Sequence, residues 1–141
     1  TYDWLVAHHP DAARRPPDAE LPVWVSFEHE ATMLPSNGAV VLELAVDPEL
    51  ITPLNIAKWG AILNYSYIPK DAADAARHRA QLELYGANDV KAVMTEFYPQ
   101  LRREIVESWV RLFGPAGSLG SDASYGLLWE VRSEWIKNVI Q

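Results

Sequence analysis

The 141-residue sequence contains no cysteine. This absence excludes disulfide scaffolds, thiolate zinc sites, iron–sulfur clusters and cysteine nucleophiles. The chain also lacks an apolar run long enough to span a bilayer and a signal-peptide pattern at its start, so we expect a cytoplasmic protein without a membrane partner. Basic residues are scarce, with 12 Lys and Arg against 19 Asp and Glu and a formal net charge of -7. Because a phosphate backbone requires a basic surface, nucleic acid is an unexpected partner.

The residues that are abundant are apolar and aromatic. Hydrophobic residues make up 49% of the chain and charged residues 22%, which is typical of a globular protein. The length suits a single domain over residues 1–141 with one sizeable core. The six tryptophans and six tyrosines are unusual, and most of them are expected to pack inside the protein.

Alternating apolar and polar residues predict strands near residues 22–30, 39–47 and 125–132. In the first strand, Val23, Val25 and Phe27 are expected on the buried face, and this strand and the second are close enough in sequence to form a hairpin. A last short helix is expected to begin at Ser133.

Helices are predicted for the middle of the chain. Asp47 precedes Pro48 in a helix-start signal, and residues 55–63 and 71–85 have helical patterns, the latter ending at Gly86. From Asp89 an apolar stripe runs to residue 97 and continues from 101 to 112, with a kink or a new helix start at Pro99. The sequence therefore predicts an α+β fold, with a small antiparallel or mixed sheet covered by helices from the middle of the chain.

Several short motifs occur in an order that resembles a bacterial family known only as a domain of unknown function. The motifs are Tyr2-Asp3-Trp4-Leu5, Pro22-Val23-Trp24, Val41-Leu42-Glu43-Leu44, Trp59 with Leu63-Asn64, Ser108-Trp109-Val110-Arg111-Leu112-Phe113 and Leu128-Trp129-Glu130-Val131. Members of that family usually carry a further strand and helix upstream and run slightly beyond the last strand. The resemblance therefore implies that the native chain extends beyond both ends, and it implies no activity.

Carboxylates and aromatic rings are the credible site chemistry in a cysteine-free chain with scattered histidines. Trp24, Glu28 and Glu30 share the polar face of the first predicted strand, and Trp129 lies on the last one. Rings stack on flat ligands without requiring sequence-specific hydrogen bonds. The candidate groove aromatics are Trp24, Tyr65, Tyr67, Tyr85, Trp129 and Trp135, whereas Trp59 and Trp109 are expected in the core.

The histidines do not predict a metal site. Strand alternation directs His29 away from Glu28 and Glu30, so the three cannot easily converge on one ion. His8 and His9 are adjacent on a helix and are interpreted as a surface pair, and His78 is expected on an exposed helix face.

Glu130 follows Trp129 on a late predicted strand, with Arg132 facing the same way. One interpretation is a strand-face ion pair, and the other is a carboxylate held in a cleft beside aromatic rings. The strand–helices–strand order is loosely similar to that of mono-ADP-ribosyltransferases, which place a catalytic glutamate on a late strand. That similarity implies NAD as cofactor and Glu130 as the catalytic acid, but the early-strand His or Arg and the Ser or Tyr partner of such enzymes are not identifiable.

Two functions from different classes follow from these residues. The first is a binding or interaction domain with an aromatic and acidic cleft formed by Trp24, Glu28, Glu30, Trp129 and Arg132, for a small molecule or a protein. The second is the NAD-dependent enzyme with Glu130. Whether the chain catalyses a reaction, and whether it forms a homo-oligomer, are left open by the sequence.

Overall fold

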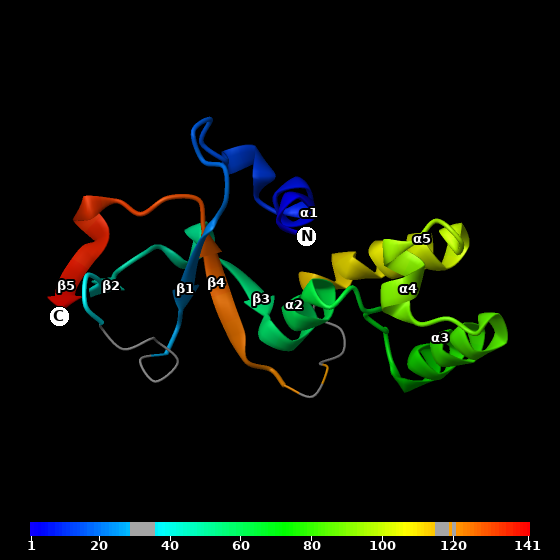
Figure 1. Ribbon diagram of the computed structural model, residues 1–141. Helices are drawn as coiled ribbons and strands as arrows, with labels where there is room; N and C mark the ends of the chain where they lie inside the picture. Colours follow the sequence, from blue (N-terminus) through cyan, green and yellow to red (C-terminus); the bar gives the residue numbers. More distant parts are fainter. Residues whose placement is uncertain (29–35, 115–118, 120) are drawn as a thin grey trace. The chain divides into compact units, whose positions relative to one another are not determined.

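The computed structural model describes residues 1–28, 36–114, 119 and 121–141 (Figure 1). The chain divides into two compact units. The strand unit comprises Tyr2–Pro53 and Ser124–Gln141, and the helical unit comprises Leu54–Ala123 together with Thr1. Small antiparallel sheets and five α-helices make the described residues an α+β structure, which confirms the predicted fold class.

The strand unit contains a three-stranded sheet in the order β1-β4-β3. β1 (Val23–Ser26) is antiparallel to β4 (Ser124–Leu128), and β3 (Thr52–Asn55) runs from the strand unit into the helical unit. β1 lies at the edge of the sheet, so its side chains are covered less than the alternating pattern predicts. Val23 is 40% exposed and Phe27, just beyond the strand, is 52% exposed, so the prediction that both face the core is wrong.

A separate two-stranded sheet pairs β2 (Val41–Leu44) with β5 (Ile136–Ile140), with an irregular register between Glu43 and Leu44. The predicted hairpin between the first two strands is therefore wrong, because β1 and β2 each pair with a segment about a hundred residues away in sequence. The predicted last helix is a single 3-10 turn, η5 (Ser133–Trp135), and the apolar residues after it form β5.

Gly126 allows close packing on one face of β4. A Cβ built on Gly126 would lie 2.5 Å from Cγ2 of Ile51, 2.9 Å from Cζ of Phe27 and 3.0 Å from Cγ2 of Val25. Only glycine fits this position without displacing its neighbours.

The remaining elements of the strand unit are short helices. They are α1 (Tyr2–His8), η1 (Ala12–Arg14) and η3 (Pro48–Leu50). The helix-start signal at Asp47 is confirmed, because its side chain accepts a hydrogen bond from the Glu49 N–H at 3.0 Å.

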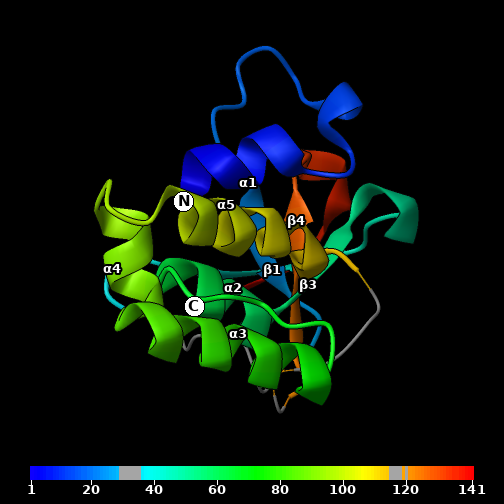
Figure 2. The ribbon, with the colours of Figure 1, turned by 90° about the vertical axis from the view of Figure 1, so that its right-hand side faces the viewer.

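The helical unit contains α2 (Ile56–Leu63), α3 (Ala72–Tyr85), α4 (Asp89–Met94) and α5 (Pro99–Ser108), which continues as the 3-10 helix η4 (Trp109–Leu112). In Figure 2, α3 and α5 run across the view and α4 stands at the left, beside one end of α5. α4 packs against α5, and α2 packs against η4. The predicted new helix start at Pro99 is confirmed, since a proline needs no hydrogen-bond acceptor in the first turn.

Side-chain caps begin three of these helices. Asn55 accepts a hydrogen bond from the N–H of Lys58, Asp71 from that of Asp74, and Asn88 from that of Lys91. Gly86 ends α3 in the left-handed conformation at φ 60°, as its position in the sequence predicts.

α2 ends differently, with a tyrosine in the left-handed region. Tyr65 has φ 57° and donates its N–H to Ile62 O at 3.0 Å, and the Ser66 N–H reaches Ala61 O at 2.8 Å. These two bonds form a Schellman motif, in which glycine is the usual residue. Tyr65 therefore carries backbone strain that a glycine would avoid.

The segment after Tyr65 is held by α5 and η4. The indole Nε1 of Trp109 donates to Ser66 O at 2.9 Å, and the Ser108 hydroxyl accepts the Ile68 N–H at 2.9 Å while donating to Ile105 O. Ile68 and Ile105 are fully buried, and Trp59 and Trp109 are 7% and 5% exposed, which confirms their predicted place in the core.

Candidate functional site

The predicted aromatic residues of the strand unit have different surroundings. Trp24 lies in β1, is half-buried and meets the ring of Tyr125 edge to face at a centroid distance of 6.4 Å. Trp129 follows β4 and is 8% exposed; its Nε1 donates to Asp11 O at 2.9 Å, and the Arg15 guanidinium lies 5.9 Å from its ring. The indole of Trp129 thus anchors the segment after α1.

His9 is buried, so its interpretation as half of a surface pair is wrong. It is 5% exposed, and its ring contacts the ring of Trp129 at 4.5 Å. Its Nδ1 accepts the Asp11 N–H at 2.9 Å. Burial lowers the pKa of His9, against the opposing charge of Asp11, so the imidazole is neutral at pH 7.

Glu130 and Arg132 lie together, as predicted. Arg132 Nη2 is 2.8 Å from Glu130 Oε1, and the two side chains are 56% and 44% exposed. β4 ends at Leu128, so Glu130 follows the strand instead of lying within it, which corrects the predicted strand boundary. An ion pair this exposed contributes at most about 1 kcal/mol to the free energy of unfolding. The catalytic role of Glu130 stays a prediction.

Of the two other predicted acidic residues, the structure describes only Glu28. Glu28 is exposed beyond the end of β1, while His29 and Glu30 lie outside the described residues. Within residues 1–28, 36–114, 119 and 121–141, no group of three or more His, Asp or Glu side chains is arranged to hold a metal ion. No helix in the same ranges combines the length and apolar character needed to cross a membrane.

The helical unit contains a polar cluster around Asp74 that the sequence reasoning missed. The carboxylate accepts hydrogen bonds from the Tyr67 hydroxyl at 2.8 Å, the Lys70 N–H at 3.0 Å and the Arg77 guanidinium at 3.1 and 3.0 Å. Although partial burial opposes ionisation, these donors lower the pKa of Asp74 to about 2. Its hydrogen bond with Asp74 raises the pKa of Arg77 in turn.

His78 belongs to the same cluster. It is 5% exposed, so the expectation of a surface histidine is wrong. Its ring stacks on that of Tyr67 at 4.0 Å, and Nε2 lies 2.6 Å from Asp89 Oδ1. The other Asp89 oxygen accepts the Tyr67 N–H at 2.9 Å. Asp89 therefore connects α4 both to His78 of α3 and to the segment that contains Tyr67.

Arg111 and Lys58 complete the polar interior of the unit. Arg111 donates to Ile68 O and lies 5.6 Å from the Tyr67 ring, with Asp74 at 3.8 Å. The ammonium of Lys58 donates to the carbonyls of Arg111 and Gly114, and burial lowers its pKa. These groups are occupied by intramolecular contacts that fasten the 66–70 segment and the end of η4, which indicates a structural role.

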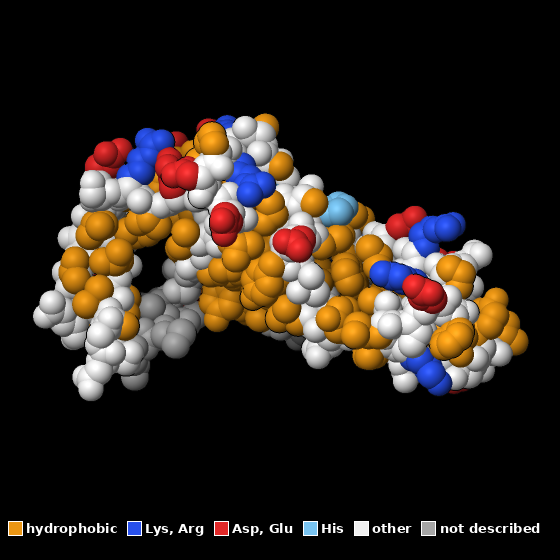
Figure 3. All heavy atoms as spheres, turned by 45° about the horizontal axis from the view of Figure 1, so that its top comes forward, with side chains coloured by type: hydrophobic (Ala, Val, Ile, Leu, Met, Phe, Trp, Pro, Cys, Tyr) orange, Lys and Arg blue, Asp and Glu red, His pale blue; other side chains and the backbone are white. Residues whose placement is uncertain are grey.

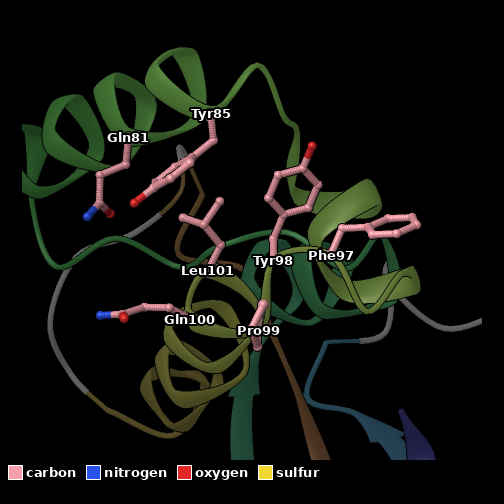
Figure 4. Close-up of a pocket in the computed structure, with 7 residues that line it drawn as sticks. All are labelled: Gln81, Tyr85, Phe97, Tyr98, Pro99, Gln100 and Leu101. Atoms are coloured by element: carbon pink, nitrogen blue, oxygen red, sulfur yellow. The ribbon is translucent and has the colours of Figure 1, made fainter.

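Two pockets in the helical unit lie on either side of Pro99. The first has a volume of about 360 Å³, within the range of sites that hold a small molecule or a side chain of a partner. Figure 4 shows the rings of Tyr85 and Tyr98 on its walls, Leu101 between them and Phe97 directed away. The residues that line it are Gln81, Tyr85, Phe97, Tyr98, Pro99, Gln100 and Leu101. None of them is charged.

The second pocket is wider, with a volume of about 510 Å³. It lies between the end of α4 and the outer face of α5. Its lining residues are Thr95, Glu96, Pro99, Arg102, Arg103, Val106 and Glu107.

Large apolar side chains lie exposed on the helical unit, and two of them, Tyr85 and Phe97, line the first pocket. We call the following residues the apolar surface: Leu84 at 78% exposure, Tyr85 at 57%, Val90 at 50%, Met94 at 62% and Phe97 at 82%. Orange side chains lie open on the helical unit in Figure 3. Three of these residues belong to the apolar stripe that the sequence predicts from Asp89, so a stripe typical of a core face lies at the surface.

Sequence reasoning found part of this site. Tyr85 was among the predicted groove aromatics, and it lines the first pocket. The spacing of Met94 and Phe97 equals that of buried residues, so the sequence predicts both on an apolar helix stripe. A signal was present nonetheless: Thr95, Glu96 and Pro99 interrupt the stripe, which leaves α4 only six residues long.

The family model described as "Domain of unknown function (DUF3841)" matches residues 1–137. No curated protein and no solved structure matches the chain.

Proposed function

The chain belongs to the DUF3841 family, and we propose that it is a protein-interaction domain whose helical unit binds a partner through the apolar surface. The observation that carries the proposal is the exposure of Leu84, Met94 and Phe97, at 78%, 62% and 82%. Apolar side chains that gather at a surface are a feature of binding sites, and two residues of the apolar surface, Tyr85 and Phe97, meet at the first pocket.

The energy available supports association. Burying a Leu, Met or Phe side chain contributes about 1.5–3 kcal/mol each. Association costs roughly 4–15 kcal/mol in lost translational and rotational freedom. Association would bury the exposed parts of the apolar surface and a partner side chain inserted between Tyr85 and Tyr98. The free energy of this burial is large enough to offset the lower end of the cost of association.

This proposal keeps the class of function expected from the sequence and changes its location. The residues of the expected cleft, Trp24, Glu28, Glu30, Trp129 and Arg132, stay predictions. Neither pocket includes Glu130, whose carboxylate is exposed and paired with Arg132. These contacts do not specifically favour the alternative of an enzyme that uses NAD with Glu130 as its catalytic acid.

The test is site-specific photo-crosslinking in the cells that produce the protein. Benzoylphenylalanine replaces Phe97 in one variant and, as the matched control, the exposed Arg79 of α3 in another. We expect a discrete crosslinked protein from position 97 that is absent from position 79. We also expect the added change Met94→Ser to weaken it.

A crosslink to a second copy of the chain identifies self-association as the interaction. Equal crosslinking from positions 97 and 79, or no discrete product from position 97, refutes the proposal. Circular dichroism of each variant shows that the fold is kept, because Phe97 and Arg79 are both exposed.

A further inference from the structure

The first pocket carries polar groups that contacts within the fold do not use. Gln81 of α3 and Gln100 of α5 each contribute a side-chain amide to its lining, and Tyr85 and Tyr98 contribute hydroxyls. Among the described residues, neither hydroxyl and no atom of the Gln100 amide forms a hydrogen bond. The pocket therefore combines aromatic walls with hydrogen-bonding groups that are available to a ligand.

One of the two amides has a fixed orientation. Nη1 of Arg77 lies 3.1 Å from Oε1 of Gln81, and a guanidinium can only donate hydrogen bonds. The amide oxygen of Gln81 is therefore occupied, and its NH2 group is the donor that remains for a ligand. Arg77 is in turn held by Asp74, so the polar cluster of the helical unit positions this side chain. Gln100 offers both a donor and an acceptor.

The lining of the first pocket favours an uncharged ligand, because none of the described residues that form it is charged. A phosphate or carboxylate would lose hydration there without gaining a cation, and an ammonium group would gain no carboxylate. A purely hydrocarbon ligand would leave the amides and hydroxyls without hydrogen-bond partners, which is unfavourable for polar groups that a ligand buries. The ligand that fits has apolar faces and polar atoms at its edge.

The shape of the pocket favours a flat ring. Figure 4 shows Tyr85 and Tyr98 on either side of Leu101, which is 3% exposed, and both glutamine amides to the left of the tyrosine rings. Aromatic rings stack on the faces of a planar ligand, which leaves the ligand edge free for hydrogen bonds. A nucleobase has this construction. The volume of about 360 Å³ lies at the lower end of the range for ligand pockets, so a single small ligand fits.

We propose that the first pocket binds a planar, uncharged heteroaromatic ring of the nucleobase type, stacked on the two tyrosine rings and hydrogen-bonded at its edge by the two glutamine amides. The four residues are Gln81, Tyr85, Tyr98 and Gln100. This inference goes beyond the proposed function and does not rest on it. Because both use the space between the tyrosine rings, a bound nucleobase would compete with a partner side chain.

The test is saturation-transfer NMR on the full chain with adenosine, guanosine, cytidine and uridine as probes. We expect at least one of them to bind with a dissociation constant on the order of 0.1 mM, as ligand efficiency predicts for about 20 non-hydrogen atoms. Ribose alone should not bind, because it has no aromatic face. The monophosphate of the bound nucleoside should bind no more tightly than the nucleoside itself, because the described lining is uncharged.

Matched variants locate the site. Gln81→Leu and Gln100→Leu should each weaken binding roughly twofold to tenfold, which is the effect of losing one neutral hydrogen bond. Gln141→Leu is the control, since this exposed residue does not line the pocket. Tyr85→Leu should weaken binding about tenfold through lost stacking, and Tyr85→Phe, which keeps the ring, should weaken it less. Circular dichroism shows that each variant is folded.

A further variant separates this inference from the proposed function. Met94→Ser changes a residue of the apolar surface that does not line the first pocket. It should therefore weaken the crosslink from position 97 and leave nucleoside binding unchanged.

Four results overturn the inference. They are the absence of a signal from all four nucleosides well above the expected dissociation constant, binding of ribose as tight as that of the nucleosides, tighter binding of the monophosphate, and binding by the Gln81, Gln100 and Tyr85→Leu variants as tight as that by Gln141→Leu. In each case the crosslink from position 97 decides the proposed function separately.

Discussion

The hydrogen bonds to Asp74 predict a pH-dependent contribution to the stability of the helical unit. The folded-state pKa of about 2 lies below the ordinary value of 3.8, so ionised Asp74 stabilises the folded state. The contribution is fully present above about pH 5 and is lost as the pH falls through the ordinary pKa towards 2. Replacing Asp74 by Asn removes the charge and keeps the size of the side chain.

The magnitude follows from the shift. One pKa unit corresponds to about 1.36 kcal/mol, so the shift of Asp74 corresponds to about 2 kcal/mol. The Asp74 side chain is only 12% exposed, but that of its main ionic partner, Arg77, is 47% exposed, which reduces the expected loss of stability to about 1–2 kcal/mol. At about pH 3 roughly half of this contribution should remain.

The assay is urea unfolding of wild type and Asp74→Asn, followed by far-UV circular dichroism between about pH 7 and pH 3. The signal reports mainly on the helical unit, because α2, α3, α4 and α5 lie in it and only α1 lies in the strand unit. Asp71→Asn is the control: it removes a charge from the same helix while retaining a capping oxygen.

The quantity of interest is the difference in unfolding free energy between wild type and Asp74→Asn at each pH. Asparagine does not titrate, so the change of this difference with pH isolates Asp74. A difference that stays constant over the pH range would refute the linkage argument. A loss no larger than that of Asp71→Asn at neutral pH would show that the hydrogen bonds to Asp74 do not stabilise the fold.

The glycines give three further predictions, each checked by thermal or urea unfolding. Gly126→Ala should destabilise the strand unit by about 1–3 kcal/mol, because the new Cβ would lie 2.5 Å from Cγ2 of Ile51; an unchanged midpoint contradicts this packing. Gly86→Ala should cost about 1 kcal/mol through its φ of 60° alone, since no atom lies within 4 Å of the new Cβ. Gly60→Ala, equally free of contacts but inside α2, should stabilise the helical unit by about 0.5–1 kcal/mol, so changes of the same sign at positions 60 and 86 would refute the backbone argument.

Local features of the helical unit could be predicted from the sequence because their causes lie within a few residues. Asp71 and Gly86 bound α3 through a cap and a left-handed residue, each formed with atoms in the adjacent turn. Pro99 begins a new helix for an equally local reason, since it lacks an N–H.

The candidate site was predicted only in part, because periodicity shows which residues share a face and not what covers that face. Met94 and Phe97 have the spacing of core residues, but nothing in the described structure covers most of their surface. Conversely, His78 lies between two arginines in the sequence, yet the Tyr67 ring and Asp89 bury it. Neither contact has a signal in the sequence around His78.

The sequence by itself determined the α+β class, the boundaries of α2 and α3 and the start of α5 at Pro99, because the local energies concerned depend on neighbours up to about one helical turn away. Tertiary structure decided which strands pair and which apolar side chains are exposed. β1 meets β4 with Val23 opposite Leu128, and β2 meets β5 with Val41 opposite Ile140. Such pairings join residues about a hundred positions apart, and several apolar segments of similar pattern compete for each, so only the assembled chain selects among them.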